Sequence, residues 1–335
     1  CIRDRLSIIG YYPVETSIRK VIKIGEKSYG ITIPKEWLDK LKIRVGSTVE
    51  TVMVGDHITI RPVTPGGLER MIILDEDDES MLAKLVIASY IEGKDLIALR
   101  GDRGSVRRAF NSIKDKLPGM IFVERGELPE IRITADERMV NIIEIIKTMK
   151  GAVQAMIDQM VKYLDNKDPG HLKEILIIDD ELDSLYFIGL RSIKRMSAKM
   201  PEESIDLTIV VKALEHMGDA LDRSSNYLMS AQISEKCADA YKEMIRLAAD
   251  YFSESFEAFL SGNYRVSLEN LNQRPVKVSN VFDISKKSAC FEELSALIHE
   301  TLILVASSAE ISEASVSRYI RNIQQQKAST IAQKE

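Results

Sequence analysis

Five acidic residues in the middle of the chain have the spacing of metal ligands on helices. Glu215, Asp219 and Asp222 stand at positions i, i+4 and i+7, so they share one face of a predicted helix. Asp179 and Asp183 form a second pair on the helix before it. Carboxylates on neighbouring helices supply oxygen ligands for divalent or trivalent metal ions, and their mutual repulsion favours a bound cation. Ordinary helices contain such pairs often, so a purely structural role stays open.

A second group of residues that could bind a ligand is basic and lies near the N-terminus. A segment of alternating apolar and polar residues there contains Arg19, Lys20, Lys23 and Lys27. Residues 14–63 hold nine Lys or Arg against six Asp or Glu, a net charge of +3, whereas residues 64–335 hold 35 against 44, a net charge of −9. A small basic module attached to a large acidic one favours nucleic acid binding at one end only.

Short strands and one short helix are expected to position these basic residues. The alternating run ends at Gly25, and Pro34 suits the first turn of a helix over 35–43, where a missing N–H costs nothing. Gly55 and Asp56, between two alternating runs, predict a tight hairpin. The Pro- and Gly-containing segment 63–67 is expected to be a linker.

Residues 68–136 alternate strands and helices in the order βαβαββ, which implies a small helix-on-sheet domain. Its first helix is expected to end at Gly93, and its second to begin with Ser105 as N-cap. The acidic run 75–79 is interpreted as a helix start rather than a metal site, because the helix dipole favours negative charge there. The segment shows no catalytic cluster.

Long helices follow from about residue 137. Apolar residues recur at helical spacing, and Pro169–Gly170, Pro201 and Gly262–Asn263 interrupt the pattern. Two successive three-helix units indicate an internal duplication with antiparallel packing. The expected helices cover 139–164, 172–196, 205–228, 237–260, 266–289 and 291–320.

The segment IRKVIKIGEKSYGITIPKEWLDKLKIRVGSTVETVMVGDHITIRP, residues 18–62, resembles the AbrB/SpoVT/MazE swapped-hairpin family. The shared features are a strand, a Gly-containing turn, an I-x-I-P-K ending, a short helix and a hairpin. The resemblance implies an obligate homodimer with interleaved strands, and a module of about 45 residues is too small to bury an adequate core alone. It assigns DNA contact to Arg19, Lys20, Lys23, Lys27, Ser28 and Lys35. A module that only dimerises is the alternative.

The segments IDDELDSLY (178–186) and VVKALEHMGDALDRSSNYL (210–228) resemble the PhoU family, whose three-helix bundles carry E/D-x-x-x-D motifs. PhoU proteins regulate phosphate uptake and bind metal clusters. The resemblance assigns a divalent or trivalent metal ion (Fe, Zn, Ni or Mg) to Asp179, Asp183, Glu215 and Asp219. The second repeat keeps Asp283 and Glu310 but has Ala314 where an aspartate belongs, so its site is expected to be lost.

Several features exclude other classes of protein. Cys1, Cys237 and Cys290 are odd in number and far apart, which predicts reduced, buried thiols in a cytoplasmic protein rather than a disulfide or a zinc site. No apolar run reaches the roughly 20 residues of a membrane span, and no signal peptide is evident. The four histidines suggest no catalytic arrangement, and no phosphate-binding loop or nucleophile elbow occurs, so no enzyme is predicted.

The sequence therefore predicts a multidomain homodimer that binds double-stranded DNA and regulates phosphate uptake. An alternative is an adaptor that engages a phosphate transporter or a signalling kinase, with a head that serves only for dimerisation. A carboxylate-metal hydrolase is a third hypothesis, which lacks a candidate base and nucleophile. The expected parts are an N-terminal extension (1–13), an AbrB-like swapped-hairpin β domain (14–63), a small α/β connector (68–136) and two PhoU-like three-helix bundles (137–232 and 233–325).

Overall fold

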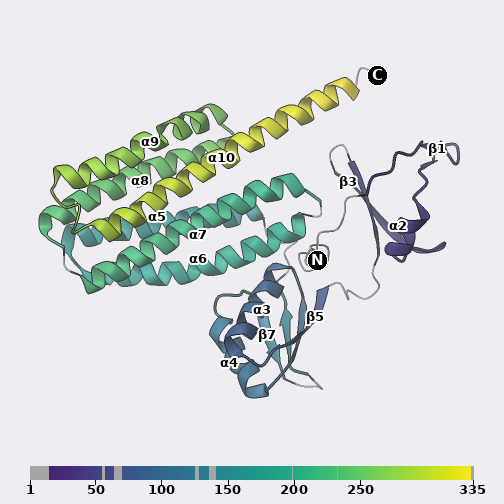
Figure 1. The fold of residues 1–335 in the computed structure, drawn as a ribbon, viewed down its shortest axis with the longest axis horizontal. Coiled ribbons are helices and arrows are strands. Elements are labelled where there is room, and N and C mark those ends of the chain that lie inside the picture. Colours follow the sequence, from purple (N-terminus) through teal and green to yellow (C-terminus); the bar gives the residue numbers. More distant parts are fainter. Residues whose placement is uncertain are drawn as a thin grey trace, which may run out of the picture. The chain divides into compact units, whose positions relative to one another are not determined.

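The computed structural model describes residues 15–54, 57–63, 70–124, 128–135, 141–197, 199–231 and 233–332 (Figure 1). The chain divides into two compact units, residues 1–66 and residues 67–335. The expected fold class is confirmed, since small β hairpins are followed by an α/β region and a helical region. None of the described helices is long and apolar enough to cross a membrane.

The first unit consists of two small hairpins and one short helix. Its elements are β1 (Ile22–Lys23), β2 (Tyr29–Gly30), α2 (Lys35–Lys40), β3 (Val49–Val54) and β4 (His57–Pro62). β1 pairs with β2 and β3 with β4, both antiparallel. Pro34 lies just before α2, where its carbonyl accepts the first helical hydrogen bonds, and α2 ends at Lys40, three residues before the predicted end. The Gly55–Asp56 turn lies outside the described residues.

The described residues of the first unit, 15–54 and 57–63, form no buried core. None of its described side chains is buried, and large apolar side chains from every part of it face solvent. Ile18 is 101% exposed and Val45 109% exposed, values of an unfolded chain. In the β3–β4 hairpin, Met53 and Ile58 stand opposite each other and are 78% and 69% exposed. An exposed apolar surface of this kind is typical of an interaction site.

The α/β region confirms the βαβαββ order. It contains β5 (Met71–Asp75), α3 (Glu79–Ile91), β6 (Leu96–Arg100), α4 (Arg103–Ile113), β7 (Met120–Val123) and β8 (Glu130–Ile133). The sheet order is β5-β6-β8-β7, with β5 and β6 parallel and the other pairs antiparallel. Leu82, Ile97 and Ile131 are fully buried in its core.

Two helix starts in this region show how the caps are made. The carboxylate of Asp78 accepts the Met81 N–H at 2.8 Å, so the acidic run 75–79 does begin a helix. The N-cap of α4 is Asp102 rather than the expected Ser105, because the Asp102 carboxylate accepts the Ser105 N–H at 2.9 Å. Gly93 ends α3 as expected, with a φ of 78° that favours glycine.

The remaining chain forms long helices that pack as two triplets with a continuous core. They are α5 (Ile142–Asn166), α6 (Pro169–Met196), α7 (Pro201–Ser230), α8 (Glu235–Ser261), α9 (Tyr264–Lys287) and α10 (Ser295–Ala332). α5, α6 and α7 contact one another, as do α8, α9 and α10, and α10 also packs along α7 (Figure 1). α6 and α7 begin earlier than predicted because Pro169 and Pro201 occupy their first turns. α10 begins at Ser295, later than predicted.

A buried arginine joins the helices to the α/β region. Arg191 of α6 is 0% exposed and donates hydrogen bonds to the carbonyls of Tyr90 at 2.7 Å and Lys94 at 2.8 Å. Its guanidinium also pairs with Asp95 at 2.5 Å and lies over the Tyr90 ring. Arg195, one turn further along α6, donates to Asp95 as well. The two regions are therefore fastened at the C-terminal end of α6.

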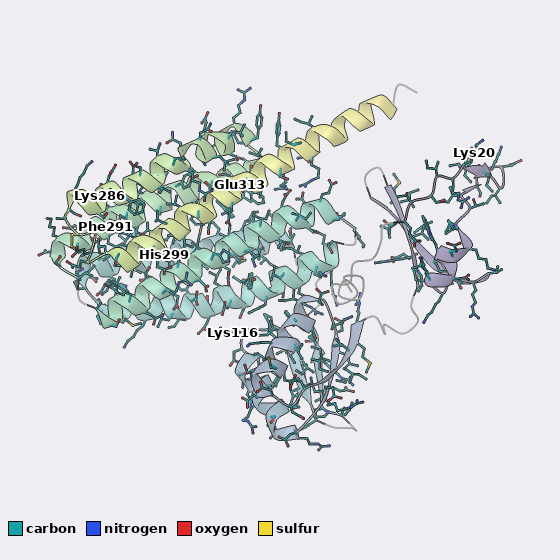
Figure 2. The ribbon with its side chains drawn as sticks, viewed as in Figure 1. Lys20, Lys116, Lys286, Phe291, His299 and Glu313 are labelled. Atoms are coloured by element: carbon teal, nitrogen blue, oxygen red, sulfur yellow. A yellow bond between two sulfur atoms is a disulfide. The ribbon has the colours of Figure 1, made fainter. Side chains whose placement is uncertain are left out.

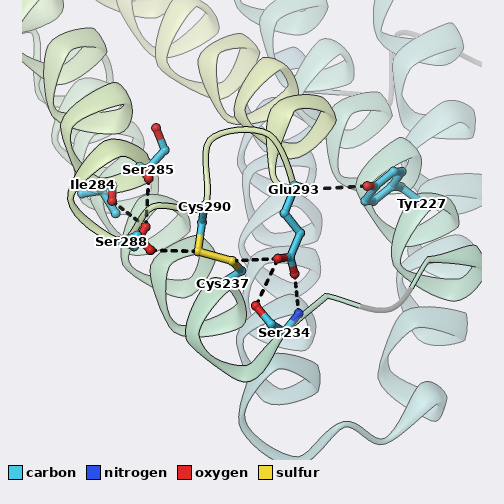
Figure 3. The surroundings of a disulfide bond; sticks show 8 residues. All are labelled: Tyr227, Ser234, Cys237, Ile284, Ser285, Ser288, Cys290 and Glu293. Carbon is cyan, nitrogen blue, oxygen red and sulfur yellow. Dashed lines mark hydrogen bonds between the residues drawn. A yellow bond between two sulfur atoms is a disulfide. The ribbon is translucent and has the colours of Figure 1, made fainter.

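The expectation of reduced thiols is wrong for two of the cysteines. Cys237 and Cys290 form a disulfide, 53 residues apart in sequence, which links the start of α8 to the connection between α9 and α10 (Figure 3). The Glu293 carboxylate lies beside it and accepts hydrogen bonds from the N–H and hydroxyl of Ser234. The antiparallel return of α9 brings these positions together, a juxtaposition that sequence spacing alone conceals.

Candidate functional site

The first candidate site is a basic hairpin in the first unit. Ile22 pairs with Gly30 and Lys23 with Tyr29, and the N–H groups of Ile24 and Gly25 donate to the Ser28 carbonyl at 2.9 and 3.2 Å. This tight turn carries Lys27 and Ser28, which the sequence predicts to contact DNA.

All six predicted DNA-contacting side chains are exposed, and they fall into three local groups. Arg19 and Lys20 precede β1 (Lys20 is labelled in Figure 2), and Lys23, Lys27 and Ser28 belong to the β1–β2 hairpin. Lys35 is the first residue of α2 and is not part of the hairpin. Flexible exposed cations of this kind suit contact with phosphate more than the reading of bases.

The second candidate site is an acidic cluster between α6 and α7. Asp179 and Asp183 of α6 face the α7 residues Glu215, Asp219 and Asp222, since their charges act on one another across the helix pair. Gly218 of α7 lies at the closest approach: a Cβ there would lie 3.3 Å from an oxygen of Asp179 and would clash with Leu182. The structure thus brings together the four carboxylates that the sequence singles out.

Burial and the charges of neighbouring carboxylates raise the pKa of three of these residues, Asp179, Glu215 and Asp222. Desolvation, followed by the charges of Asp222, Asp183 and Asp219, raises the pKa of Asp179 to about 7. Desolvation, followed by Asp219 and Asp183, raises the pKa of Glu215 to about 7. Such clustering of perturbed acids is typical of functional sites, although structural ion-pair networks produce it too.

Two basic residues partly neutralise the cluster. The ammonium of Lys116, from the turn after α4, lies 2.6 Å from Asp183 Oδ2. Arg223 pairs with Asp219 at 3.2 Å and with Glu300 of α10 at 3.0 Å. His216 is exposed and stands 3.7 Å from Glu215, outside the carboxylate face, as its position in the sequence suggests.

The ligand types of the cluster suit a metal ion, but their arrangement does not form a complete coordination site. Carboxylate oxygens suit hard cations, and facing helices are a common platform for such ligands. Across the described residues, however, no three His, Cys, Asp or Glu side chains are grouped closely enough to hold a metal ion. Asp179, Asp183, Glu215 and Asp219 would hold a cation only after their side chains move closer together, and Lys116 already lies at Oδ2 of Asp183.

The second triplet places its acidic residues differently. Asp283 lies in a shallow groove between α8 and α9, together with Asp239 and Glu243 of α8. Lys236 and Lys287 line the same groove. Glu310 belongs to α10 and does not line it. In this repeat, which lacks the full acidic motif, Asp283 and Glu310 therefore do not line a common groove.

Lys116 and Asp222 belong to the cluster but are not among the site residues predicted from the sequence. Lys116 comes from the α/β region, 67 residues before Asp183, and no periodicity or motif marks it. Asp222 was recognised on the acidic face but was not among the predicted ligands, whereas its charge is the largest electrostatic influence on Asp179. The i+7 spacing was the available signal.

Two segments of the chain match models of known protein families. A family model described as antidote-toxin recognition MazE, bacterial antitoxin, matches residues 22–68, and the PhoU domain model matches residues 146–228. No curated protein and no solved structure gives a significant match to the chain. The basic hairpin lies within the first range, and the acidic cluster within the second. The chain thus joins a MazE/AbrB-like antitoxin domain to a PhoU domain, the fusion that the sequence resemblance predicted.

Proposed function

We propose that the protein is a dimeric DNA-binding regulator of phosphate uptake. The observation that carries this proposal is a basic, exposed hairpin on a unit with no buried side chain among its described residues. A second copy whose strands interleave with this unit would cover its apolar surface and present two sets of basic side chains to a duplex. This role is regulatory binding, without an enzymatic step.

The helical body is proposed to sense the cellular state. Its acidic cluster would hold a divalent or trivalent cation through Asp179, Asp183, Glu215 and Asp219, and the cation would supply positive charge where the carboxylates now repel. The protein's own part is to hold these carboxylates on two closely packed helices. We propose phosphate status as the signal because the PhoU domain occupies this body.

Fluorescence anisotropy with duplexes taken from upstream of phosphate-transport genes tests the DNA-binding role. The triple variant Arg19→Ala, Lys20→Ala, Lys23→Ala should bind weakly. The magnitude of the slope of log K against log salt should decrease by about 3, since each lost phosphate contact reduces that magnitude by about 0.9. The matched control replaces three exposed lysines of the helical body, Lys173, Lys236 and Lys286, by Ala. Equal binding by both triple variants would contradict the proposal.

An adaptor without DNA binding is the second candidate. Exposed apolar side chains on the helical body favour it, namely Ile177, Ile205 and Val276, which are all more than half exposed. Co-purification that recovers a component of a phosphate transporter or a signalling kinase, but no DNA, would favour the adaptor over the DNA-binding regulator.

A further inference from the structure

Lys116 stands in the acidic cluster where a cation would. Its ammonium is 2.6 Å from Asp183 Oδ2, and the Asp183 side chain is only 17% exposed (Lys116 is labelled in Figure 2). The charges of Asp180 and Asp179 also act on the same ammonium. Lys116 does not belong to the helices that form the cluster, because it lies in the turn between α4 and β7 of the α/β region.

The polar contacts described between this turn and α6 come from two side chains of α6, Asp183 and Ser184. Besides the Lys116 ion pair, the Ser184 hydroxyl donates to the Asp115 carbonyl at 3.2 Å. The same hydroxyl lies 3.3 Å from the Asp180 carbonyl, so it divides one proton between two acceptors. The Lys116 side chain is 48% exposed, and ion pairs with an exposed partner contribute little to stability in general.

The other end of the same interface is anchored. Arg191 is fully buried with carbonyl and carboxylate partners, and Arg195 donates to the Gly93 carbonyl at 3.2 Å as well as to Asp95. The interface between the α/β region and α6 therefore has a buried polar contact at Arg191 and an ion pair with a half-exposed lysine at Lys116.

We propose that Lys116 is a tethered cation that competes with metal ions for the acidic cluster. A metal ion bound to Asp183 would repel the Lys116 ammonium, which lies 2.6 Å from Oδ2 of the same carboxylate, so metal binding and docking of the α4–β7 turn oppose each other. A bound metal would release the turn, while Arg191 keeps the two regions attached. This inference rests on the metal-binding part of the proposed function and extends it by connecting the cluster to the α/β region.

The competition has a measurable size. If Lys116 occupies the cluster about five-sixths of the time, the upper end for an ion pair with an exposed partner, the apparent affinity for a metal ion is about sixfold lower than that of the open cluster. The variant Lys116→Met keeps the length of the side chain and removes its charge. It should therefore bind the probe ion Mn²⁺ about sixfold more tightly than the wild-type chain, as measured by electron paramagnetic resonance of free Mn²⁺.

Lys194→Met is the matched control. Lys194 of α6 pairs with Glu92 of the α/β region at 2.9 Å, and its side chain is 48% exposed, the same as that of Lys116. It crosses the same interface at the anchored end, away from the cluster. Its loss should leave Mn²⁺ affinity within twofold of the wild type, because it does not compete for a cluster carboxylate.

A second readout follows the lysines themselves. Saturating Mn²⁺ should raise the rate at which an amine-reactive acetylating reagent modifies Lys116 several-fold, measured by peptide mass spectrometry on the full chain, while Lys194 reacts at an unchanged rate. Equal Mn²⁺ affinity in wild type and Lys116→Met, with no change in Lys116 acetylation, would overturn the competition and leave the metal site standing. Absence of Mn²⁺ binding even in Lys116→Met would overturn both. Neither result affects the DNA-binding test.

Discussion

At the scale of single residues, Asp179 and Glu215 should make the protein less stable as pH rises. Burial and neighbouring carboxylates raise the pKa of each to about 7, so the folded chain binds more protons than the unfolded chain between about pH 4 and 7. The stabilising effect of these protons is complete below the unfolded pKa and is lost as pH increases through 7. Metal-free protein should therefore melt at a lower temperature at pH 8 than at pH 5.5, after allowing for other groups.

Asp179→Asn isolates this effect, because the amide imitates the protonated acid. Its melting temperature should exceed that of the wild type at pH 8, by about 2–4 °C for each kcal/mol of repulsion removed, and should match it at pH 5.5. Glu174→Gln, an exposed position on the same helix, serves as control. A pH-independent difference between Asp179→Asn and the wild type would contradict the assignment. Differential scanning calorimetry in the presence of a chelator makes the comparison.

The acidic cluster shows what residue spacing reveals and what it hides. Positions i, i+4 and i+7 on one helix necessarily share a face, so Glu215, Asp219 and Asp222 could be placed together from sequence. The pairing of that face with Asp179 and Asp183 was predicted from their place on the neighbouring helix and was strengthened by the family resemblance. Lys116 could not be predicted, since a turn residue in another region carries no periodic signal and reaches the cluster only through tertiary packing.

At the scale of elements, Arg191 should hold α6 against the α/β region. Replacement by Leu removes its charge and leaves the Tyr90 and Lys94 carbonyls and Asp95 without these hydrogen bonds. Leaving a buried acceptor without its donor costs about 1–3 kcal/mol in general, whereas Asp95 keeps its pair with Arg195. Arg191→Leu should therefore lower the free energy of unfolding by about 2–4 kcal/mol in urea titrations, since two carbonyls lose Arg191 as a donor. Lys194→Met, which breaks an exposed pair at the same interface, should cost about 0–1 kcal/mol.

The disulfide should stabilise the second helical triplet. Closing a chain segment of 53 residues in the unfolded state contributes about 2–4 kcal/mol. Urea unfolding of the wild type in the presence of a phosphine reductant should show this loss relative to the oxidised protein. The double variant Cys237→Ala, Cys290→Ala should unfold identically with and without reductant. Reductant-independent stability of the wild type would show that the two thiols are not joined.

Helix positions were predictable because apolar periodicity is a local property. The expected ranges for α5 to α9 differ from the observed bounds by a few residues, and the largest differences arise at helix starts such as Pro201. There the chain enters the helix before its first inward-facing apolar residue. The disulfide was not predictable, because it depends on which helix ends meet after packing.

At the scale of the whole molecule, the two units differ in how much apolar surface they bury. The second unit buries large apolar clusters from both its regions, whereas no described side chain of the first unit is buried. The family resemblance anticipated this difference, since a module of about 45 residues buries too little surface alone. Dimerisation is accordingly proposed to reside in the first unit.

The β3–β4 hairpin allows this proposal to be tested on its own. Val49, Met53 and Ile58 share one face of the hairpin, and the adjacent Thr59 lies on the opposite face with the Glu50–Arg61 ion pair. Ile58→Asp places a charge on the apolar face, where a second copy would have to desolvate it, and should convert a dimer into a monomer in sedimentation equilibrium. Thr59→Asp adds the same charge one residue away and should remain dimeric. If Ile58→Asp stays dimeric, this apolar face is not the surface on which two copies meet, and the exposed hairpin needs a different partner.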